Sequence, residues 1–259
     1  MNANGSAPVL ALEGVSKSFG PVQALNDVDF EVHPGEVVAL VGDNGAGKST
    51  LVKTIAGIHP PDSGTIRFEG DEVAIHGPAD AVDLGIATVY QDLALCDNLD
   101  VVENLFLGRE EKSDGPASVL GQLDEVDMEK RTGELLQNLA VTITDVRAEV
   151  GTMSGGQRQQ VAIARSLLGE PKLVMLDEPT AALGVRQTAQ VLELVKRLRE
   201  RGYGVVVISH NLADVFEVAD RIYVLRLGRE AGDFKAGEVS QDQVVAAITG
   251  ASGNGGGQR

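Results

Sequence analysis

The chain has 259 residues, 43% of them hydrophobic, a length that suits one large α/β domain with an insert better than two full domains. Its net charge of -16 disfavours nucleic acid as a partner, because surfaces for a phosphate backbone cluster Lys and Arg. The single cysteine, Cys96, excludes an internal disulfide. The first residues lack a signal-peptide pattern, and no apolar run reaches the roughly 18 residues of a membrane span. We therefore expect a cytoplasmic protein.

Short strands dominate the first third of the chain. Residues 9–32 hold alternating or β-branched runs separated by the turn signal Gly20-Pro21, which predicts antiparallel strands. A change of pattern follows, from a compact apolar strand to a glycine-rich turn and then to helical spacing that stops at Gly57. The expected elements of this part are strands at 35–41, 65–70 and 85–90 and one helix from residue 48.

Residues 92–153 differ in character and predict a helical insert. Helices are expected at 103–108 and 128–139, with a polar loop at 109–122 between them. After the insert, helices and strands alternate: helix 156–168, strand 172–177, helix 185–200, strand 205–209, helix 211–220, strand 222–228 and a short helix near 238–250. In helix 185–200 the spacing predicts one apolar face made of Val185, Val191, Leu192, Val195 and Leu198.

This alternation predicts an α/β fold with a mostly parallel core sheet, an antiparallel β subdomain and an α-helical insert subdomain. One domain is expected over residues 1–250. The remaining residues, 251–259, form a glycine-rich tail that we expect to be flexible.

A phosphate-binding pattern lies between a predicted strand and a predicted helix. Its glycines let backbone N–H groups converge on phosphate oxygens, and the following helix directs its positive end to the same anion. Lys48 is expected on the β- and γ-phosphates, the Ser49 hydroxyl on Mg²⁺, and Thr50 near the α-phosphate. The eight residues of the pattern are Gly42, Asp43, Asn44, Gly45, Ala46, Gly47, Lys48 and Ser49.

Two acids end the apolar strand at 172–177. Mg²⁺ prefers oxygen ligands, and ligands gather at the carboxyl edge of a parallel sheet. We expect Asp177 to hold the metal directly or through water and Glu178 to polarise the attacking water. Alone, the pair is equally compatible with a strand followed by a solvated turn; the glycine-rich loop makes the metal site the better interpretation.

The segment from Met153 to Thr180, MSGGQ followed by RQQVAIARSLLGEPKLVMLDEPT, resembles the defining stretch of the ABC (ATP-binding cassette) ATPases. The resemblance runs from Val9 to about Leu227. It implies ATP with Mg²⁺ as cofactor, and Gln91 as a loop glutamine on the metal and the γ-phosphate side. It also implies His210 as a γ-phosphate switch and Phe19 as a ring for adenine, although Phe19 alone is also compatible with a core position.

The resemblance implies a nucleotide-sandwich dimer as well. Ser154, Gly155, Gly156 and Gln157 open a predicted helix, and in the family they contact the nucleotide held by the opposite subunit's Lys48 site. Met153 stands where leucine is usual, a mild packing change, and Gly184 replaces a common loop aspartate. Loss of that carboxylate is expected to alter communication between the two sites while hydrolysis survives.

Within the family, the chain most resembles the ATPases of ribose-, xylose- and fructose-type sugar importers. That resemblance implies a homodimer at the cytoplasmic face of the membrane, bound to a separate transmembrane permease that an external sugar-binding protein serves. The alternative is a soluble cassette of the iron-sulfur cluster assembly type. Apolar residues beside Gln91 either line a groove for a permease helix or pack the insert: Leu93, Leu95, Leu105, Phe106 and Leu107.

Overall fold

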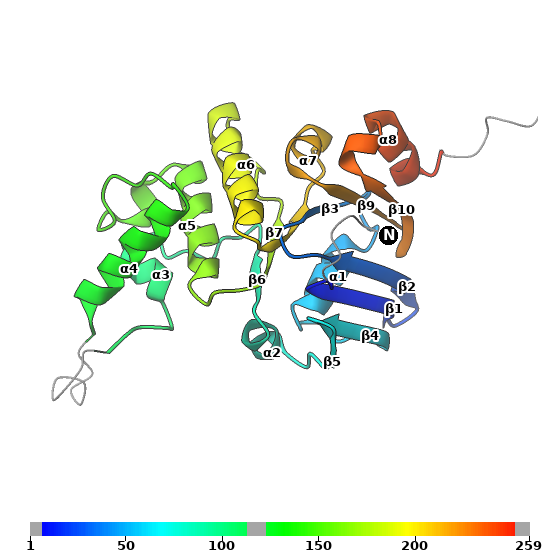
Figure 1. Ribbon diagram of the computed structural model, residues 1–259, viewed down its shortest axis with the longest axis horizontal. Coiled ribbons are helices and arrows are strands. Elements are labelled where there is room, and N and C mark those ends of the chain that lie inside the picture. The colour runs from blue at the N-terminus through cyan, green and yellow to red at the C-terminus, as the bar shows by residue number, and fades with distance from the viewer. Residues whose placement is uncertain (1–6, 113–122, 252–259) are drawn as a thin grey trace, which may run out of the picture.

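The computed structural model describes residues 7–112 and 123–251, and Figure 1 shows two β-sheets with a helical region beside them. The strands are β1 Leu10–Phe19, β2 Val22–Val32, β3 Val37–Val41, β4 Ser63–Phe68, β5 Asp71–Val73, β6 Ile86–Val89, β7 Leu173–Asp177, β8 Gly204–Ile208, β9 Arg221–Arg226 and β10 Arg229–Lys235. The helices are α1 Lys48–Ile55, α2 Pro78–Asp83, α3 Val101–Phe106, α4 Glu125–Asn138, α5 Gly155–Leu167, α6 Val185–Glu200, α7 Leu212–Val218 and α8 Gln241–Thr249. Short 3-10 turns lie at Val150–Thr152 and Ala236–Glu238.

The central sheet has the order β10-β9-β3-β8-β7-β6, and its strands are parallel except for β10. The second sheet is antiparallel, in the order β2-β1-β4-β5. Strands such as β3 and β8 are buried along their whole length, as expected where both faces of a parallel sheet are covered. The predicted fold class is therefore confirmed.

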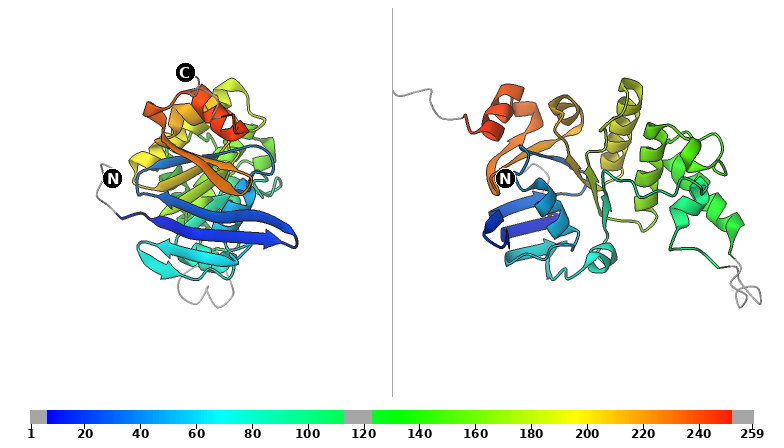
Figure 2. Two further views of the ribbon diagram at one scale, coloured as in Figure 1. Left: turned by 90° about the vertical axis from the view of Figure 1, so that its right-hand side faces the viewer. Right: turned by 180° about the vertical axis from the view of Figure 1, so that it is seen from behind.

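Helices cover the central sheet on both faces (Figures 1 and 2). One apolar cluster joins the sheet to α3, α4, α5 and α6. A second packs α1 between the central and antiparallel sheets, and a third packs α7 and α8 on β3 and β9. Helix α5 contacts both α3 and α6, so it connects the helical region to the sheet. The boundaries of the insert at about 92–153 stay a prediction.

Several features differ from the expectations or escaped them. The prediction of an apolar face on α6 is wrong for Val185, whose side chain is 89% exposed, because the first turn of the helix lies at the edge of the core. The sequence did not predict β5, α2 or β10: β5 and α2 have three and six residues, and β10 is a polar edge strand. The glycine-rich tail lies, except for Ala251, outside the described residues.

Within the described residues, no helix is both long and apolar enough to span a bilayer. Strand order determines which loops lie together at one edge of the central sheet. Because β3, β8 and β7 are adjacent and parallel, the loops that follow them leave the same edge of the sheet. These loops contain the glycine-rich segment, His210 and Glu178 respectively.

Candidate functional site

The loop between β3 and α1 requires glycine at two positions of positive φ. Gly42 has φ 155° and Gly47 has φ 108°. A Cβ at Gly42 would clash with the carbonyl oxygen of Leu225, and one at Gly47 would lie 2.6 Å from the carbonyl oxygen of Ala24. A Cβ at Gly45 would meet open space. The loop is thus pressed against β9 and β2 at both ends, while its middle faces outward.

Helix α1 begins without a side-chain cap. Its N-cap is Gly47, in the left-handed region, and no side chain accepts a hydrogen bond from the first turn. The N–H groups of that turn therefore remain available to an anion. The Lys48 ammonium donates to the carbonyl oxygens of Gly42 at 2.7 Å and Asp43 at 3.0 Å, which holds the cation across the mouth of the loop.

The turn between β9 and β10 is hydrogen-bonded to the glycine-rich loop and to β2. Gly228 N–H donates to the Ala46 carbonyl at 2.9 Å, and Asn26 N–H donates to the Gly228 carbonyl at 2.8 Å. These backbone contacts come from segments about 180 and 200 residues apart from their partners. No residue pattern in the sequence points to them, because the hydrogen bonds join backbone groups that every non-proline residue carries.

Two carboxylates and one imidazole meet at the same sheet edge. Asp177 ends β7 opposite Ile208 of β8. Glu178 follows with φ 50°, and its N–H donates to the Ile208 carbonyl at 2.9 Å. The Glu178 Oε2 lies 2.7 Å from Nδ1 of His210, whose side chain is 75% exposed whereas that of Glu178 is 18% exposed. Glu178 is thus fixed in a rarely used backbone conformation, which is typical of functional positions.

Charge in this cluster is only partly compensated. Burial raises the pKa of Asp177, and the neighbouring Glu178 raises it further, against the opposing effect of Lys48. Burial also lowers the pKa of Lys48, against the attraction of Glu178, Asp43 and Asp177. A lysine and carboxylates held partly desolvated at one edge are typical of a site prepared for a charged ligand.

The N-terminus of α5 is capped by its own side chains. The Ser154 Oγ accepts from Gln157 N–H at 3.3 Å, and the Gln157 Oε1 accepts from Ser154 N–H at 3.0 Å. Gly156 lies against α6, since a Cβ there would be 2.8 Å from the Gln187 Cβ. The structure brings this segment to the start of α6 and not to the glycine-rich loop of the same chain.

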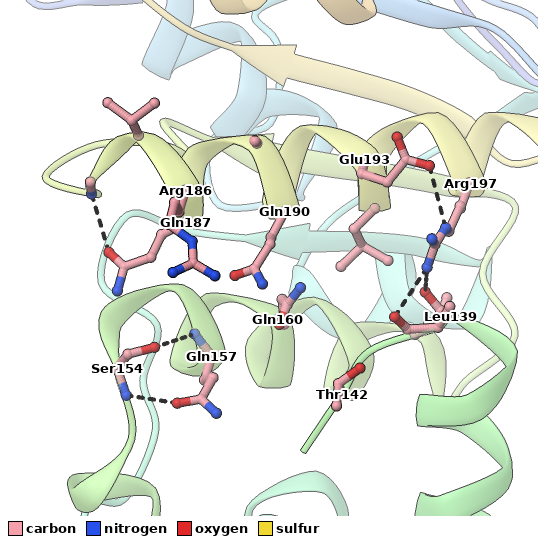
Figure 3. Close-up of a pocket in the computed structure, with 15 residues that line it drawn as sticks. Leu139, Thr142, Ser154, Gln157, Gln160, Arg186, Gln187, Gln190, Glu193 and Arg197 are labelled. Atoms are coloured by element: carbon pink, nitrogen blue, oxygen red, sulfur yellow. Dashed lines mark hydrogen bonds and ion pairs between the residues drawn. The ribbon is translucent and has the colours of Figure 1, made fainter. Parts of the chain in front are cut away.

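Figure 3 shows the polar groove between α5 and α6, with a volume of about 1010 Å³. Side-chain amides line both walls, Gln157 and Gln160 from α5 and Gln187 and Gln190 from α6. The Gln187 Oε1 accepts from Gly184 N–H at 3.1 Å, so Gln187 stabilises the loop in which the family's usual aspartate is missing. The groove contains no residue of the glycine-rich loop.

Phe19 and Gln91 lie on two other segments of the chain, the end of β1 and the loop after β6. Phe19 is at the end of β1 with 43% of its surface exposed, so the alternative of a core phenylalanine is wrong. Gln91 is exposed on the loop after β6, beside a groove of about 250 Å³. Leu93, Leu105 and Leu107 line that groove, but only Leu107 is exposed: Leu105 and Phe106 belong to the apolar core, and Leu93 and Leu95 pack against it.

The Arg165 guanidinium fixes the loop near Gln91. It donates to the carbonyl oxygens of Ala94 at 2.7 Å and Leu93 at 2.8 Å, and burial lowers its pKa. The sequence analysis assigned no role to Arg165 or Gln187. Arg165 lies within the Met153–Thr180 segment, but the pattern does not show which loop its side chain reaches.

Taken together, the parallel sheet and the uncapped, lysine-bearing loop define a P-loop nucleotide-binding domain. A family profile described as "ABC transporter" matches residues 25–181. The chain belongs to the ABC transporter family as one of its ATP-binding cassettes, which couple ATP hydrolysis to transport.

Two relatives of full length are similar to the chain. The fructose import ATP-binding protein FrcA of Rhizobium meliloti is 45% identical, over 94% of this chain and 95% of that protein. The xylose/arabinose import ATP-binding protein XylG of Sulfolobus acidocaldarius is 45% identical, over 93% and 94% respectively. Ribose import ATP-binding protein RbsA 2 of Streptomyces avermitilis is 42% identical over 95% of this chain, which spans 48% of that longer relative.

Solved structures agree with this assignment. A nucleotide-free ATP-binding cassette from an ABC transporter superposes with a TM-score of 0.79 at 27% identity, over 94% of this chain and 96% of that one. A bacterial ABC transporter cassette solved as a dimer has a TM-score of 0.72 at 25% identity, over 88% and 98%. The fold is thus that of a cassette along most of its length.

Proposed function

We propose that the chain is the ATPase subunit of an importer for a monosaccharide, acting as a homodimer on a separate membrane permease. The observation that carries this proposal is 45% identity to two sugar import ATP-binding proteins over nearly their whole length. Both are of single-cassette size, which favours pairing of two separate copies. These relatives also favour the importer over a cytosolic cassette of the iron-sulfur cluster assembly type.

The glycine-rich loop is the proposed seat of the triphosphate. Its residues Gly42, Asn44, Gly45, Ala46 and Gly47 would surround the phosphates. The N–H groups of Asn44 and Ala46 donate to Asp43 in this structure, and the Lys48 ammonium donates to the carbonyl oxygens of Gly42 and Asp43; these donors would turn to phosphate oxygens when the nucleotide binds. Support comes from the uncapped first turn of α1, to which Ser49 and Thr50 add hydroxyl groups. Phe19 supplies an exposed ring for the base.

The residues near Lys48 fit Mg²⁺. No cluster of three or more His, Cys, Asp or Glu side chains suited to a metal occurs within residues 7–112 and 123–251. Mg²⁺ is usually held by one or two carboxylates together with substrate phosphates, so the donor set of Ser49, Asp177 and Gln91 suffices. The bound ion would neutralise charge on phosphate oxygens. It would also stabilise the ionised form of Asp177, which burial disfavours.

Glu178 and His210 are the proposed catalytic pair, with Gln91 as a third group. Glu178 orients and polarises the attacking water, and His210, 2.7 Å away, holds that carboxylate in position. When nucleotide binds, the exposed His210 ring would leave Glu178 and turn toward the γ-phosphate. The strained φ of Glu178 fixes the direction of its side chain.

A second copy is proposed to complete each site. Ser154, Gly155, Gly156 and Gln157 open α5 with the positive end of a helix dipole, which suits the phosphates bound by the opposite subunit. The dimeric state of a similar cassette supports this arrangement. Gln91 and the 250 Å³ groove beside it are the proposed permease contact, since Leu107 there is exposed.

The test is to purify what the closed cassette binds. Tagged Glu178→Gln protein with ATP and Mg²⁺ is added to solubilised host membranes, and co-purifying proteins are identified by mass spectrometry. We expect turnover to fall on the order of a hundredfold or more while ATP still binds, and a multi-span permease to be recovered. The same variant with Lys48→Ala added is the control, because it should recover nothing in response to ATP. Recovery of soluble assembly proteins alone would contradict the importer.

A further inference from the structure

The tip of the β1–β2 hairpin carries an exposed apolar pair. Phe19 pairs across the turn with Val22, and 43% and 62% of their surfaces are exposed. An aromatic ring at a hairpin tip has few neighbours to restrain it. Its orientation therefore depends on whatever segment packs against the tip.

That segment is the loop leaving α1, residues 58–62, which we call the exit loop. The Phe19 ring centroid lies 5.0 Å from that of His59, with the rings inclined at 76°. This is an edge-to-face contact, a favoured geometry for two aromatic rings. The Lys17 ammonium lies 5.8 Å from the same Phe19 centroid, within the range of a cation–π contact.

Asp62 ties the exit loop to the end of β1. Its Oδ1 accepts from the Lys17 ammonium at 2.7 Å, and its Oδ2 accepts from Ser18 N–H at 2.7 Å. The Asp62 N–H in turn donates to the Ser16 carbonyl at 2.8 Å. The hydrogen bond from Lys17 lowers the pKa of Asp62, so the carboxylate is charged at neutral pH. Three consecutive residues before Phe19 are thus held by one side chain and its backbone.

The exit loop is also fixed to the phosphate-binding helix. The N–H groups of Ile58 and His59 donate to the carbonyl oxygen of Lys53, in the last turn of α1, at 2.8 and 3.1 Å. A continuous path of contacts therefore runs from the P-loop along α1 to the ring of Phe19. This path sets the position of the ring relative to the triphosphate site.

We propose that His59 is a positioning residue for the nucleotide base: its ring, aided by the Asp62–Lys17 pair, holds Phe19 in the orientation that receives adenine. The proposal rests on the proposed function, in which Phe19 contacts the base. His59 acts through Phe19 and does not touch phosphate. It therefore contributes to the affinity for a nucleotide but not for a bare phosphate chain.

Two ligands separate these contributions. A non-hydrolysable ATP analogue carries the base, and inorganic tripolyphosphate lacks it. Binding of each is measured by calorimetric titration to the wild-type protein and to His59→Ala, His59→Phe and Phe19→Ala. His76→Ala is the matched control, since His76 lies in another loop and only its backbone N–H has a hydrogen bond given by the structure, to Asp80.

We expect His59→Ala and Phe19→Ala each to weaken binding of the ATP analogue roughly three- to tenfold and to leave tripolyphosphate unchanged. His59→Phe should restore most of the affinity, because it keeps an aromatic contact. A double variant that combines His59→Ala with Phe19→Ala should bind the analogue no more weakly than Phe19→Ala alone, since the two residues act as one unit. His76→Ala should bind both ligands like the wild type.

Each other outcome counts against a defined part of the proposal. If Phe19→Ala weakens the analogue and His59→Ala does not, the role of His59 falls and that of Phe19 stands. If neither variant changes the affinity, the role of Phe19 in the proposed function falls together with the inference. An equal loss for both ligands in His59→Ala would place its effect at the P-loop and overturn the inference. Failure of His59→Phe to restore binding would also contradict it.

Discussion

Two helix N-termini of this cassette, those of α1 and α5, differ in how their first N–H groups are satisfied. α1 starts at Gly47, whose left-handed backbone offers no side-chain cap. α5 starts at Ser154, and Ser154 and Gln157 cap each other reciprocally. Any helix N-terminus attracts anions, but the first leaves its donors open and the second already uses part of them.

The two termini also differ in the charged residues beside them. α1 faces Asp177 and Glu178, which are partly desolvated, whereas the first turn of α5 contains no acidic residue and packs on α6. At α1, the N–H donors stay open and the charge of the partly buried carboxylates stays incompletely compensated until an anion and a metal bind. At α5, the cap satisfies part of the first turn without a ligand. Only one of the two termini therefore depends on its ligand.

The largest expected effect is at Lys48. Lys48→Ala removes charge-assisted hydrogen bonds for which α1 has no substitute, and we expect ATP affinity to fall on the order of a hundredfold. Titration with a fluorescent ATP analogue measures the change. Lys130→Ala on the exposed face of α4 is the control and should bind normally. Unchanged affinity in Lys48→Ala would count against its phosphate role.

The next effect concerns the glycines that shape the open terminus. Gly47→Ala forces a Cβ to 2.6 Å from the Ala24 carbonyl oxygen at φ 108°, whereas Gly45→Ala, at φ 77°, meets open space. We expect Gly47→Ala to lower the free energy of unfolding by about 2 kcal/mol more than Gly45→Ala, the cost of overpacking. Urea denaturation of both variants measures the difference. Equal losses would show that the close approach of β2 is not what requires Gly47.

A smaller effect is expected at the closed terminus. Ser154→Ala removes the cap of α5 and should lower the free energy of unfolding by about 1 kcal/mol without nucleotide. The same substitution in the first turn of α1, Ser49→Ala, should leave the free energy of unfolding unchanged because the Ser49 side chain caps nothing. Thermal unfolding of the two nucleotide-free variants compares them. Equal stability losses would remove the contrast between the termini.

The smallest effect concerns Asp177. Its pKa in the folded protein is raised by burial, so ionisation is easier in the unfolded chain, and stability falls as the pH rises through the two pKa values. At neutral pH, Asp177→Asn should therefore raise the stability of the nucleotide-free protein, by less than the capping effect. The same change should reduce the further stabilisation by ATP with Mg²⁺. Thermal unfolding between pH 4 and 8 tests both signs; lower stability of the nucleotide-free variant at pH 7 would contradict the account.

Much of the fold follows from local patterns. The predicted strand and helix at 35–57 appear as β3 and α1, and the helix predicted at 185–200 is α6. β10 was missed because an exposed edge strand carries no apolar alternation, and Val185 was misplaced because periodicity does not show where a helix leaves the core. The roles assigned to the site residues stay predictions that the variants above test.

The P-loop and the acid pair could be found from the sequence alone, because glycine positions, a lysine and a strand ending in two carboxylates are local features. The tertiary structure places His210 at 2.7 Å from Glu178, since strand order puts β7 and β8 side by side. It also decided the contact of His59 with Phe19 and of Gln187 with the start of α5. Such contacts join residues that lie about 30 or more positions apart, and no short pattern encodes them.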